Sequence, residues 1–143
     1  MKVQVSTAIG KTLNWMVAKC EGKTYADVSF LIGGMGYDEL IDYASNLFAF
    51  DKHWSSEDLR AEILRHAKIA DYTTDWTRAG VILAREWIEL LSDKPDGWKA
   101  IVSDSGDNAP FGIGPTPVIA IMRCYVISKL GYEVEVPEEF VGE

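Results

Sequence analysis

The sequence is poor in the residues on which most enzymes and metal sites depend. It contains two histidines, His53 and His66, and two cysteines, Cys20 and Cys124, in a chain of 143 residues. Neither histidine lies near a nucleophile motif such as Gly-x-Ser-x-Gly, and no His-x-x-x-His or Cys-x-x-Cys pair offers the spacing of metal ligands. We therefore expect no catalytic residue set, no metal and no cofactor. We favour a non-enzymatic role, while an enzyme that uses carboxylates stays an open alternative.

Basic charge and long apolar runs are also scarce. The chain has 22 acidic and 14 basic residues, a formal net charge of -8. This excess argues against general binding to nucleic acids or anionic membranes, because such binding relies on lysine and arginine contacts to phosphate. No run approaches the roughly 18 apolar residues of a membrane span, and the first residues lack the apolar core of a signal peptide. We expect a cytoplasmic protein.

The two cysteines lie in apolar helical patterns. A free thiol in such a pattern is usually buried, and a cytoplasmic protein usually keeps its thiols reduced. We expect Cys20 and Cys124 to be buried free thiols, and a disulfide between them stays an open alternative.

The composition that is present is that of one globular domain spanning residues 1–143. Hydrophobic residues make up 48% and charged residues 25% of the chain, which are ordinary values for a folded protein. The spacing of apolar residues predicts an α+β fold, with about four helices packed on a small, mainly antiparallel sheet. We expect helices after Ser6, over 37–50, after Ser55 or Ser56, from Thr74 or Asp75 to 86 and after Thr116, and strands at 2–5, 25–32, 87–91, 98–102 and 134–136. Residues 138–143 form an acidic tail that we expect to fray.

The strongest helix signal begins at Thr116. Thr116 suits an N-cap, Pro117 suits the first helical position, and apolar residues recur until Gly131, which suits a C-cap. The approach over 112–115 has little side-chain bulk, so we expect a tight turn that leaves backbone N–H groups open at the helix start. Gly114 and Thr116 are therefore candidates for binding an anion such as phosphate. The alternative is an ordinary helix start without a ligand.

A second set of residues has the chemistry of a nucleotide site. Aromatic rings offer surfaces on which bases stack, and a hydroxyl beside a carboxylate can bind ribose or base edges. Arg123 interrupts an apolar helical pattern, so it is either a ligand-facing cation or an edge residue whose guanidinium reaches the solvent. Trp15 also has a structural alternative, because it could cover the edge of the hydrophobic core. The set comprises Trp15, Tyr72, Thr74, Asp75, Trp76 and Arg123, with Trp98 as a further aromatic ring.

Three blocks of sequence carry a resemblance to a known family. They read LNWMVAKCEG near the N-terminus, YTTDWTRAG with the following apolar segment and WIEL, and GPTPVIAIMRCYVISKLGYEVEVP. The blocks cover about half of the chain, and with them the sequence resembles the NinX-like family of phage and prophage proteins. The resemblance implies a phage origin and a shared site, and it names no reaction. Because the blocks contain Asp75, Trp76, Thr116 and Arg123, it favours a role for these four residues in that site.

The resemblance does not extend over residues 25–70, which we expect to be a lineage-specific helical segment. The family usually carries a glycine where Ala79 stands and a proline where Val81 stands. These departures put in doubt any backbone role for 79–81.

Three functions are compatible with these features. The first is a phage-encoded, non-enzymatic protein that binds a small ligand and sequesters a nucleotide-derived signal of host defence, as a sponge does. Such a protein has no direct nucleic-acid or membrane partner, and we expect a dimer or larger homo-oligomer. The alternative is an acidic inhibitor that docks on a basic DNA-binding or defence protein of the host or the phage. An enzyme acting through Asp75 is a third reading.

Overall fold

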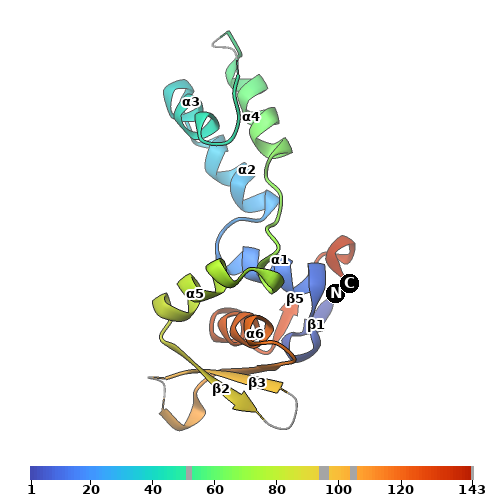
Figure 1. The fold of residues 1–143 in the computed structure, drawn as a ribbon. Coiled ribbons are helices and arrows are strands. Elements are labelled where there is room, and N and C mark those ends of the chain that lie inside the picture. Colours follow the sequence, from blue (N-terminus) through green and yellow to red (C-terminus); the bar gives the residue numbers. More distant parts are fainter. Residues whose placement is uncertain (51–52, 94–96, 104–105, 143) are drawn as a thin grey trace. The chain divides into compact units, whose positions relative to one another are not determined.

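The computed structural model of the protein describes residues 1–50, 53–93, 97–103 and 106–142. These residues form α-helices and two small antiparallel sheets (Figure 1), so the predicted α+β class is confirmed. The chain divides into two compact units. Unit 1 comprises Met1–Cys20 and Ala70–Glu143, and unit 2 comprises Glu21–Ile69. Unit 2 nearly coincides with the segment 25–70 that the sequence set apart.

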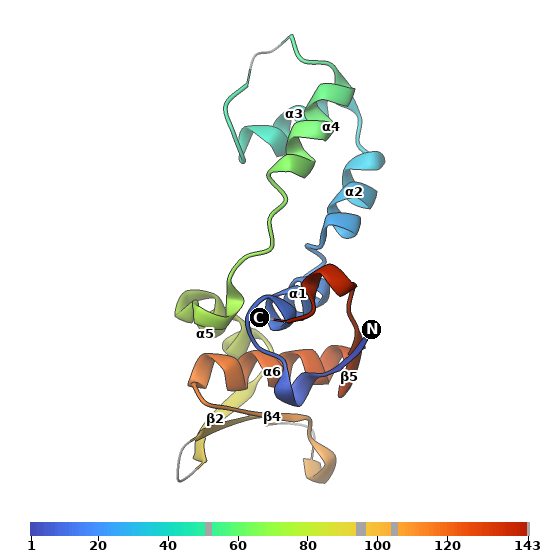
Figure 2. The same cartoon turned by 90° about the vertical axis from the view of Figure 1, so that its right-hand side faces the viewer.

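Unit 1 is organised around the helix α6 (Pro117–Leu130). A three-stranded sheet lies against one side of this helix, in the order β2 (Ile88–Asp93), β3 (Gly97–Val102) and β4 (Phe111–Gly114). The helices α1 (Gly10–Cys20) and α5 (Trp76–Arg85) pack on α6 away from the sheet (Figures 1 and 2). Strands β1 (Lys2–Gln4) and β5 (Glu133–Glu135) pair separately. Short 3-10 helices complete unit 1: η1 (Val5–Thr7), η2 (Tyr72–Thr74), η3 (Gly106–Asn108) and η4 (Glu138–Phe140).

Helix α6 is buried on nearly all sides because it lies between these layers. Every residue from Ala120 to Ile127 is buried, which is the pattern of a central helix and not of a surface helix with one apolar face. Its predicted ends are confirmed. The Thr116 hydroxyl accepts a hydrogen bond from the Ile119 N–H at 3.2 Å, and Gly131 follows the last turn with a φ of 92° that favours glycine.

The stretch before α6 is a strand and not the turn that the sequence predicted. Gly112 and Gly114 point at α6 from β4, and both are buried. A Cβ atom on Gly112 would lie 2.4 Å from the backbone N of Cys124 and 2.8 Å from the carbonyl oxygen of Ala120. The glycines are therefore required because the strand backbone touches the helix backbone, as β3 pairs with β4 and presses it against α6.

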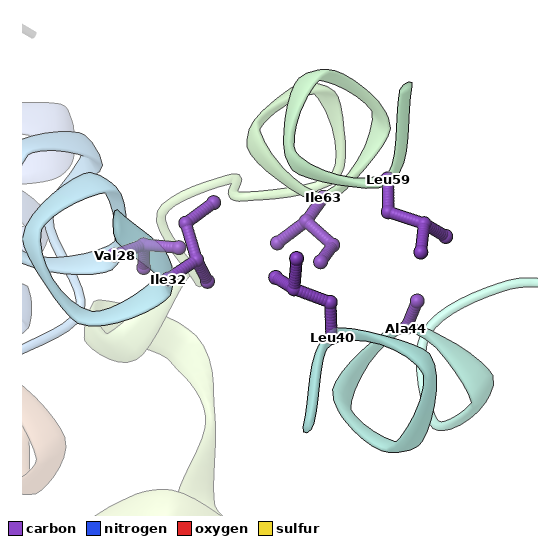
Figure 3. Packing of buried hydrophobic residues seen from close by; sticks show 6 residues of the cluster. All are labelled: Val28, Ile32, Leu40, Ala44, Leu59 and Ile63. Atoms are coloured by element: carbon purple, nitrogen blue, oxygen red, sulfur yellow. The ribbon is translucent and has the colours of Figure 1, made fainter. Parts of the chain in front are cut away.

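Unit 2 is a small helical unit of α2 (Tyr25–Gly33), α3 (Tyr37–Ser45) and α4 (Ser56–Arg65). Each helix contributes two residues to its core, as Figure 3 shows. The six residues are Val28, Ile32, Leu40, Ala44, Leu59 and Ile63. The predicted strand over 25–32 is wrong. Thr24 and Asp27 form a capping box that starts a helix, and Val28 and Ile32 then share one face at a spacing of four residues.

The remaining boundaries agree in part with the predictions. Ser55 and Asp75 cap α4 and α5, and the hairpin of β2 and β3 is confirmed, although its turn residues 94–96 lie outside the described part of the chain. The first helix begins at Gly10 because Ser6 belongs to η1.

The expected fraying of the tail is wrong up to residue 142. The Thr12 hydroxyl lies 2.7 Å from the carbonyl oxygen of Phe140 and 2.6 Å from that of Gly142. Over the described ranges, every helix is too short or too polar to cross a membrane.

Candidate functional site

Arg123 binds the protein's own backbone. Its side chain is buried, and its Nε and Nη2 atoms donate to the carbonyl oxygen of Ala8 at 3.1 and 3.0 Å. Its Nη1 atom donates to the carbonyl oxygen of Ile113 at 2.7 Å. Burial lowers the pKa of the guanidinium. The reading of Arg123 as an edge residue that reaches the solvent is wrong, because the side chain joins α6 to β4 and to the segment before α1.

The start of α6 is a packed junction. A Cβ atom on Gly114 would lie 2.8 Å from the Ile119 side chain and 2.9 Å from the Ala120 backbone N. The Ile119 N–H is already bound by the Thr116 hydroxyl. Pro117 has no N–H to offer. The junction therefore presents fewer open amides than the sequence suggested, although the Thr116 side chain itself is exposed.

A hydrogen-bond network centred on Asp71 fixes η2 to α1. The Asp71 carboxylate accepts from the hydroxyls of Thr73 at 2.9 Å and Thr74 at 2.8 Å, and from the Asn14 side-chain amide at 3.2 Å. The Asn14 oxygen in turn accepts from the Thr73 N–H at 3.0 Å. The hydrogen bonds from Thr74 and then Thr73 lower the pKa of Asp71. Sequence reasoning missed Asn14 and Asp71, although an aspartate before two threonines is a recognisable turn signal.

Asp75 starts α5. Its carboxylate accepts from the Arg78 N–H at 3.1 Å and from the Arg78 Nη1 atom at 2.8 Å. The backbone hydrogen bond from Arg78, followed by its side-chain bond, lowers the pKa of Asp75. The Arg78 guanidinium also lies 5.7 Å from the ring centroid of the buried Tyr72. The predicted polar residues of this segment thus make internal contacts that position η2 and α5.

The structure brings some of the predicted site residues together. Both η2 and α5 contact α6, and η2 also contacts α1. The predicted aromatic residues have different surroundings, however. Trp15 packs against Phe140 with ring centroids 6.3 Å apart, whereas Trp76 is 58% exposed in the first turn of α5. Of the predicted aromatic residues on η2 and α5, Trp76 is therefore the one that the solvent reaches.

The outer side of α5 carries exposed apolar side chains beside the exposed polar residues Thr77, Arg78 and Arg85. Its inner face buries Ala79 and Ile82, while Trp76 and Val81 are each 58% exposed. Trp87, two residues after the helix, is 72% exposed. Gly80 lies between Trp76 and Val81 in the sequence of the helix, and a Cβ atom added to it would meet nothing within 4 Å. We call the set of exposed apolar side chains Trp76, Val81 and Trp87 the tryptophan face. Sequence reasoning missed Val81 and Trp87, because Val81 follows Trp76 by five residues, which is not the spacing of one helical face, and Trp87 lies beyond the end of the helix.

Trp87 has an unusual backbone. Among the described residues other than glycine, it is the one with a positive φ, of 56°. The position follows the C-cap Glu86, where helices commonly carry glycine. The carbonyl oxygen of Trp87 accepts from the Ser103 N–H at 2.9 Å and from its hydroxyl at 2.8 Å, which holds this conformation. A left-handed backbone costs a residue with a Cβ roughly 1–2 kcal/mol.

The adjacent end of α5 is tied firmly to α6. Glu86 accepts from Lys129 Nζ and from Arg85 Nε, each at 2.9 Å, and Arg85 Nη2 lies 3.0 Å from the Tyr125 hydroxyl. Burial opposes ionisation of Glu86, but the hydrogen bonds from Lys129 and Arg85 outweigh it and lower its pKa. The tryptophan face is thus displayed on a fixed element.

These features define a small α+β protein in which most buried polar groups serve packing, and in which exposed tryptophans lie at the start of α5 and just after its end. No group of three metal-binding side chains occurs within the ranges that the structure describes. The chain belongs to the bacteriophage P22 NinX family, whose model matches residues 4–129. The predicted resemblance is confirmed, and the match runs through unit 2 as well as unit 1. No curated protein matches the chain.

Proposed function

We propose that this phage-family protein is a non-enzymatic binding protein that recognises another protein through the tryptophan face of α5. The observation that carries the proposal is the exposure of Trp76, in the first turn of a helix whose other side is buried, and of Trp87, just after the end of that helix. Large exposed side chains of this kind are the commonest anchors of protein interfaces, and a few of them supply most of the binding energy. Folding alone gains little from an indole that is 72% exposed.

The partner class follows from the charge of the chain. The net charge is -8, and it is shared between the units, with nine acidic and five basic residues in 21–69 and thirteen and nine in the remainder. Such a field accelerates encounter with a basic protein and contributes little to the strength of the final contact. A basic DNA-binding or defence protein of the host or the phage fits both requirements: its charge is attracted and an apolar groove holds the tryptophans.

A second candidate is the small nucleotide-derived ligand, which the protein would sequester as a host defence signal. The observation that favours it is the exposed ring of Trp76, close in sequence to the exposed Thr74 and Arg78. A base stacked on such a ring gains about 1–3 kcal/mol. This candidate uses one end of the tryptophan face, and it predicts that Trp76 matters while Trp87 does not.

The experiment begins with capture of partners from infected cells, followed by calorimetry with the purified partner. Trp76→Ala and Trp87→Ala should each weaken binding by at least about tenfold, the loss of an interface anchor. Tyr132→Ala is the matched control, because Tyr132 is 53% exposed on the loop before β5. Raising the salt concentration should slow association more than it speeds dissociation.

The small-ligand candidate has its own readout. Material released from the purified protein is identified by mass spectrometry, and cyclic and ADP-ribose-type nucleotides are tested by thermal shift. A nucleotide that raises the melting temperature of the wild type but not of Trp76→Ala would favour this candidate. Captured proteins that bind both tryptophan variants as tightly as the wild type would contradict the interaction proposal.

A further inference from the structure

The sheet of unit 1 has one face that α6 covers and one that it does not. Side chains alternate between the two faces of a sheet, and the inward positions of β2, β3 and β4 include the buried residues Ile88, Ala100 and Gly112. The register pairs Ile88 with Val102 and Ala100 with both Leu90 and Gly112. The residues next to these therefore point away from α6.

The outward positions are mainly apolar, although the solvent reaches them. Leu91 is 49% exposed, Ile113 is 45% exposed and Phe111 is 37% exposed, and Ile101 is half-buried between neighbouring strands. Natural sheets usually carry polar residues on a solvent face, and a contiguous apolar face of this kind is typical of a surface that another protein covers. We call the set Glu89, Leu91, Lys99, Ile101, Phe111 and Ile113 the outer sheet face.

Two opposite charges occupy defined positions on the outer sheet face. Glu89 lies opposite Ile101, and Lys99 lies opposite both Leu91 and Ile113. The amine of Lys99 lies 4.7 Å from the ring centroid of Phe111, so its side chain follows the sheet surface. Glu89, Leu91, Lys99 and Ile101 therefore form the corners of a rectangle on this face. Glu89 and Lys99 lie at the ends of one diagonal, and Leu91 and Ile101 lie at the ends of the other.

We propose that the outer sheet face binds a second copy of this chain. A two-fold axis in the plane of contact, running from Leu91 towards Ile101, places Glu89 of each copy close to Lys99 of the other. The same rotation places Leu91 on Leu91 and Ile101 on Ile101. A face that carries one acid and one base across such a diagonal is complementary to itself, which is the requirement for a symmetric dimer. The strands of the two sheets then cross steeply, as in orthogonal sheet packing.

The test is a charge exchange across the proposed two-fold axis, read by analytical ultracentrifugation over about a hundredfold range of concentration, because a dimer dissociates on dilution. The wild type should dimerise. Glu89→Lys and Lys99→Glu each place like charges together, so each should raise the dissociation constant by at least about tenfold. The double variant restores opposite charges and should return the dissociation constant to near the wild-type value. Both substituted positions lie outside the tryptophan face.

Two controls isolate the surface from charge and folding. Glu139→Lys, on the exposed side of η4, makes the same change in net charge as Glu89→Lys and should leave the dimer intact. Leu91→Ser should weaken the dimer without altering charge, with circular dichroism confirming the fold. A wild type that stays monomeric throughout overturns the proposal. So does a dimer that the single exchanges leave unchanged, or a double variant that remains as weak as the singles. Trp87→Ala should dimerise normally, so failure of this proposal is distinct from failure of the proposed function.

Discussion

Replacing Gly112 by alanine tests whether β4 and α6 are in backbone contact. The added Cβ would lie 2.4 Å from the Cys124 N, 2.8 Å from the Ala120 carbonyl oxygen and 2.9 Å from the Arg123 carbonyl carbon. All three atoms belong to the backbone of the central helix, so no side-chain rotation can relieve the overlap. The strand must move away from α6, and the contacts on either side of it must open.

The magnitude follows from this geometry. Inserting a methyl group into a packed core typically costs 1–3 kcal/mol, and we expect about 3 kcal/mol or more because the obstructing atoms are backbone. Gly80→Ala is the matched control within the same unit. Nothing lies within 4 Å of its added Cβ, and alanine is favoured over glycine inside a helix. Gly80→Ala should therefore raise the free energy of unfolding by about 0.5–1 kcal/mol.

The assay is urea unfolding followed by tryptophan fluorescence in a Trp54→Phe background. Trp54 belongs to unit 2, and the other four tryptophans, at 15, 76, 87 and 98, belong to unit 1. The signal then reports the unit that contains both glycines, which matters because two compact units need not unfold together. A loss below about 1 kcal/mol for Gly112→Ala, well under the cost of overpacking, would refute the backbone contact.

Three further predictions concern α6 and its ends. Arg123→Met leaves the carbonyl oxygens of Ala8 and Ile113 without their donors and should lower the free energy of unfolding by about 2 kcal/mol. Arg123→Lys should recover only part of this loss, since a single amine cannot reach both carbonyl oxygens as the guanidinium does. Thr116→Ala should cost about 1 kcal/mol in the same urea assay through loss of the N-cap, and Thr116→Ser should restore it. Burial raises the pKa of Cys124 to about 12, so a thiol reagent at pH 8 should modify this residue only after unfolding. The free energy of unfolding should fall as pH rises from 9 towards 12, because the thiol of the unfolded chain loses its proton first. Cys124→Ala should remove this part of the pH dependence. If the reagent modified Cys124 equally fast in the folded protein, that result would contradict its burial.

The parts of the fold that could be predicted have local signals. The start of α6 depends on Thr116 and Pro117, its end depends on Gly131, and Asp75 caps the helix that directly follows it. Each of these signals acts within one helical turn, so no knowledge of distant residues is needed. The antiparallel hairpin of β2 and β3 was equally accessible, since its strands are adjacent in sequence.

Helix α2 was missed because two local signals conflict. Tyr25, Val28 and Phe30 favour a strand by propensity, whereas the capping box of Thr24 and Asp27 favours a helix. The conflict is decided by packing: a helix puts Val28 and Ile32 on one face against α4, where Ile63 completes the core. Propensity alone could not supply that information, because α4 lies some thirty residues further along the chain.

The glycines of β4 have a similar ambiguity. A glycine near a helix start can open a loop to an anion, or it can let two backbones touch. The sequence offered the first use as a candidate at Gly114, beside an ordinary helix start, and the 2.4 Å distance at Gly112 shows the second use for that residue. The deciding fact is that β3 pairs with Phe111–Gly114 and holds it on α6, which is a relation between segments and not a property of either one.

The candidate site shows why polar residues in apolar patterns were hard to interpret. Arg123 interrupts an apolar sequence, and such a residue can face a ligand or satisfy buried backbone groups. Its bonds to the carbonyl oxygens of Ala8 and Ile113 account for its presence by packing alone. The same holds for Asp75, whose carboxylate caps α5 and binds Arg78. The partners of these bonds are internal, and the predicted contacts of Arg123 and Asp75 with a ligand stay a prediction.

Trp87 presents the opposite case, since neither packing nor capping accounts for it. Its backbone has a positive φ of 56°, at a position where glycine would cost nothing, and its ring is 72% exposed. A residue that strains the backbone and gains little burial contributes little to stability, and strained residues concentrate at functional sites. No local pattern in the sequence reveals a φ angle, so this signal exists only in the structure. It is the reason that we propose a binding surface at α5 and the residues that follow it, and not at the buried Arg123.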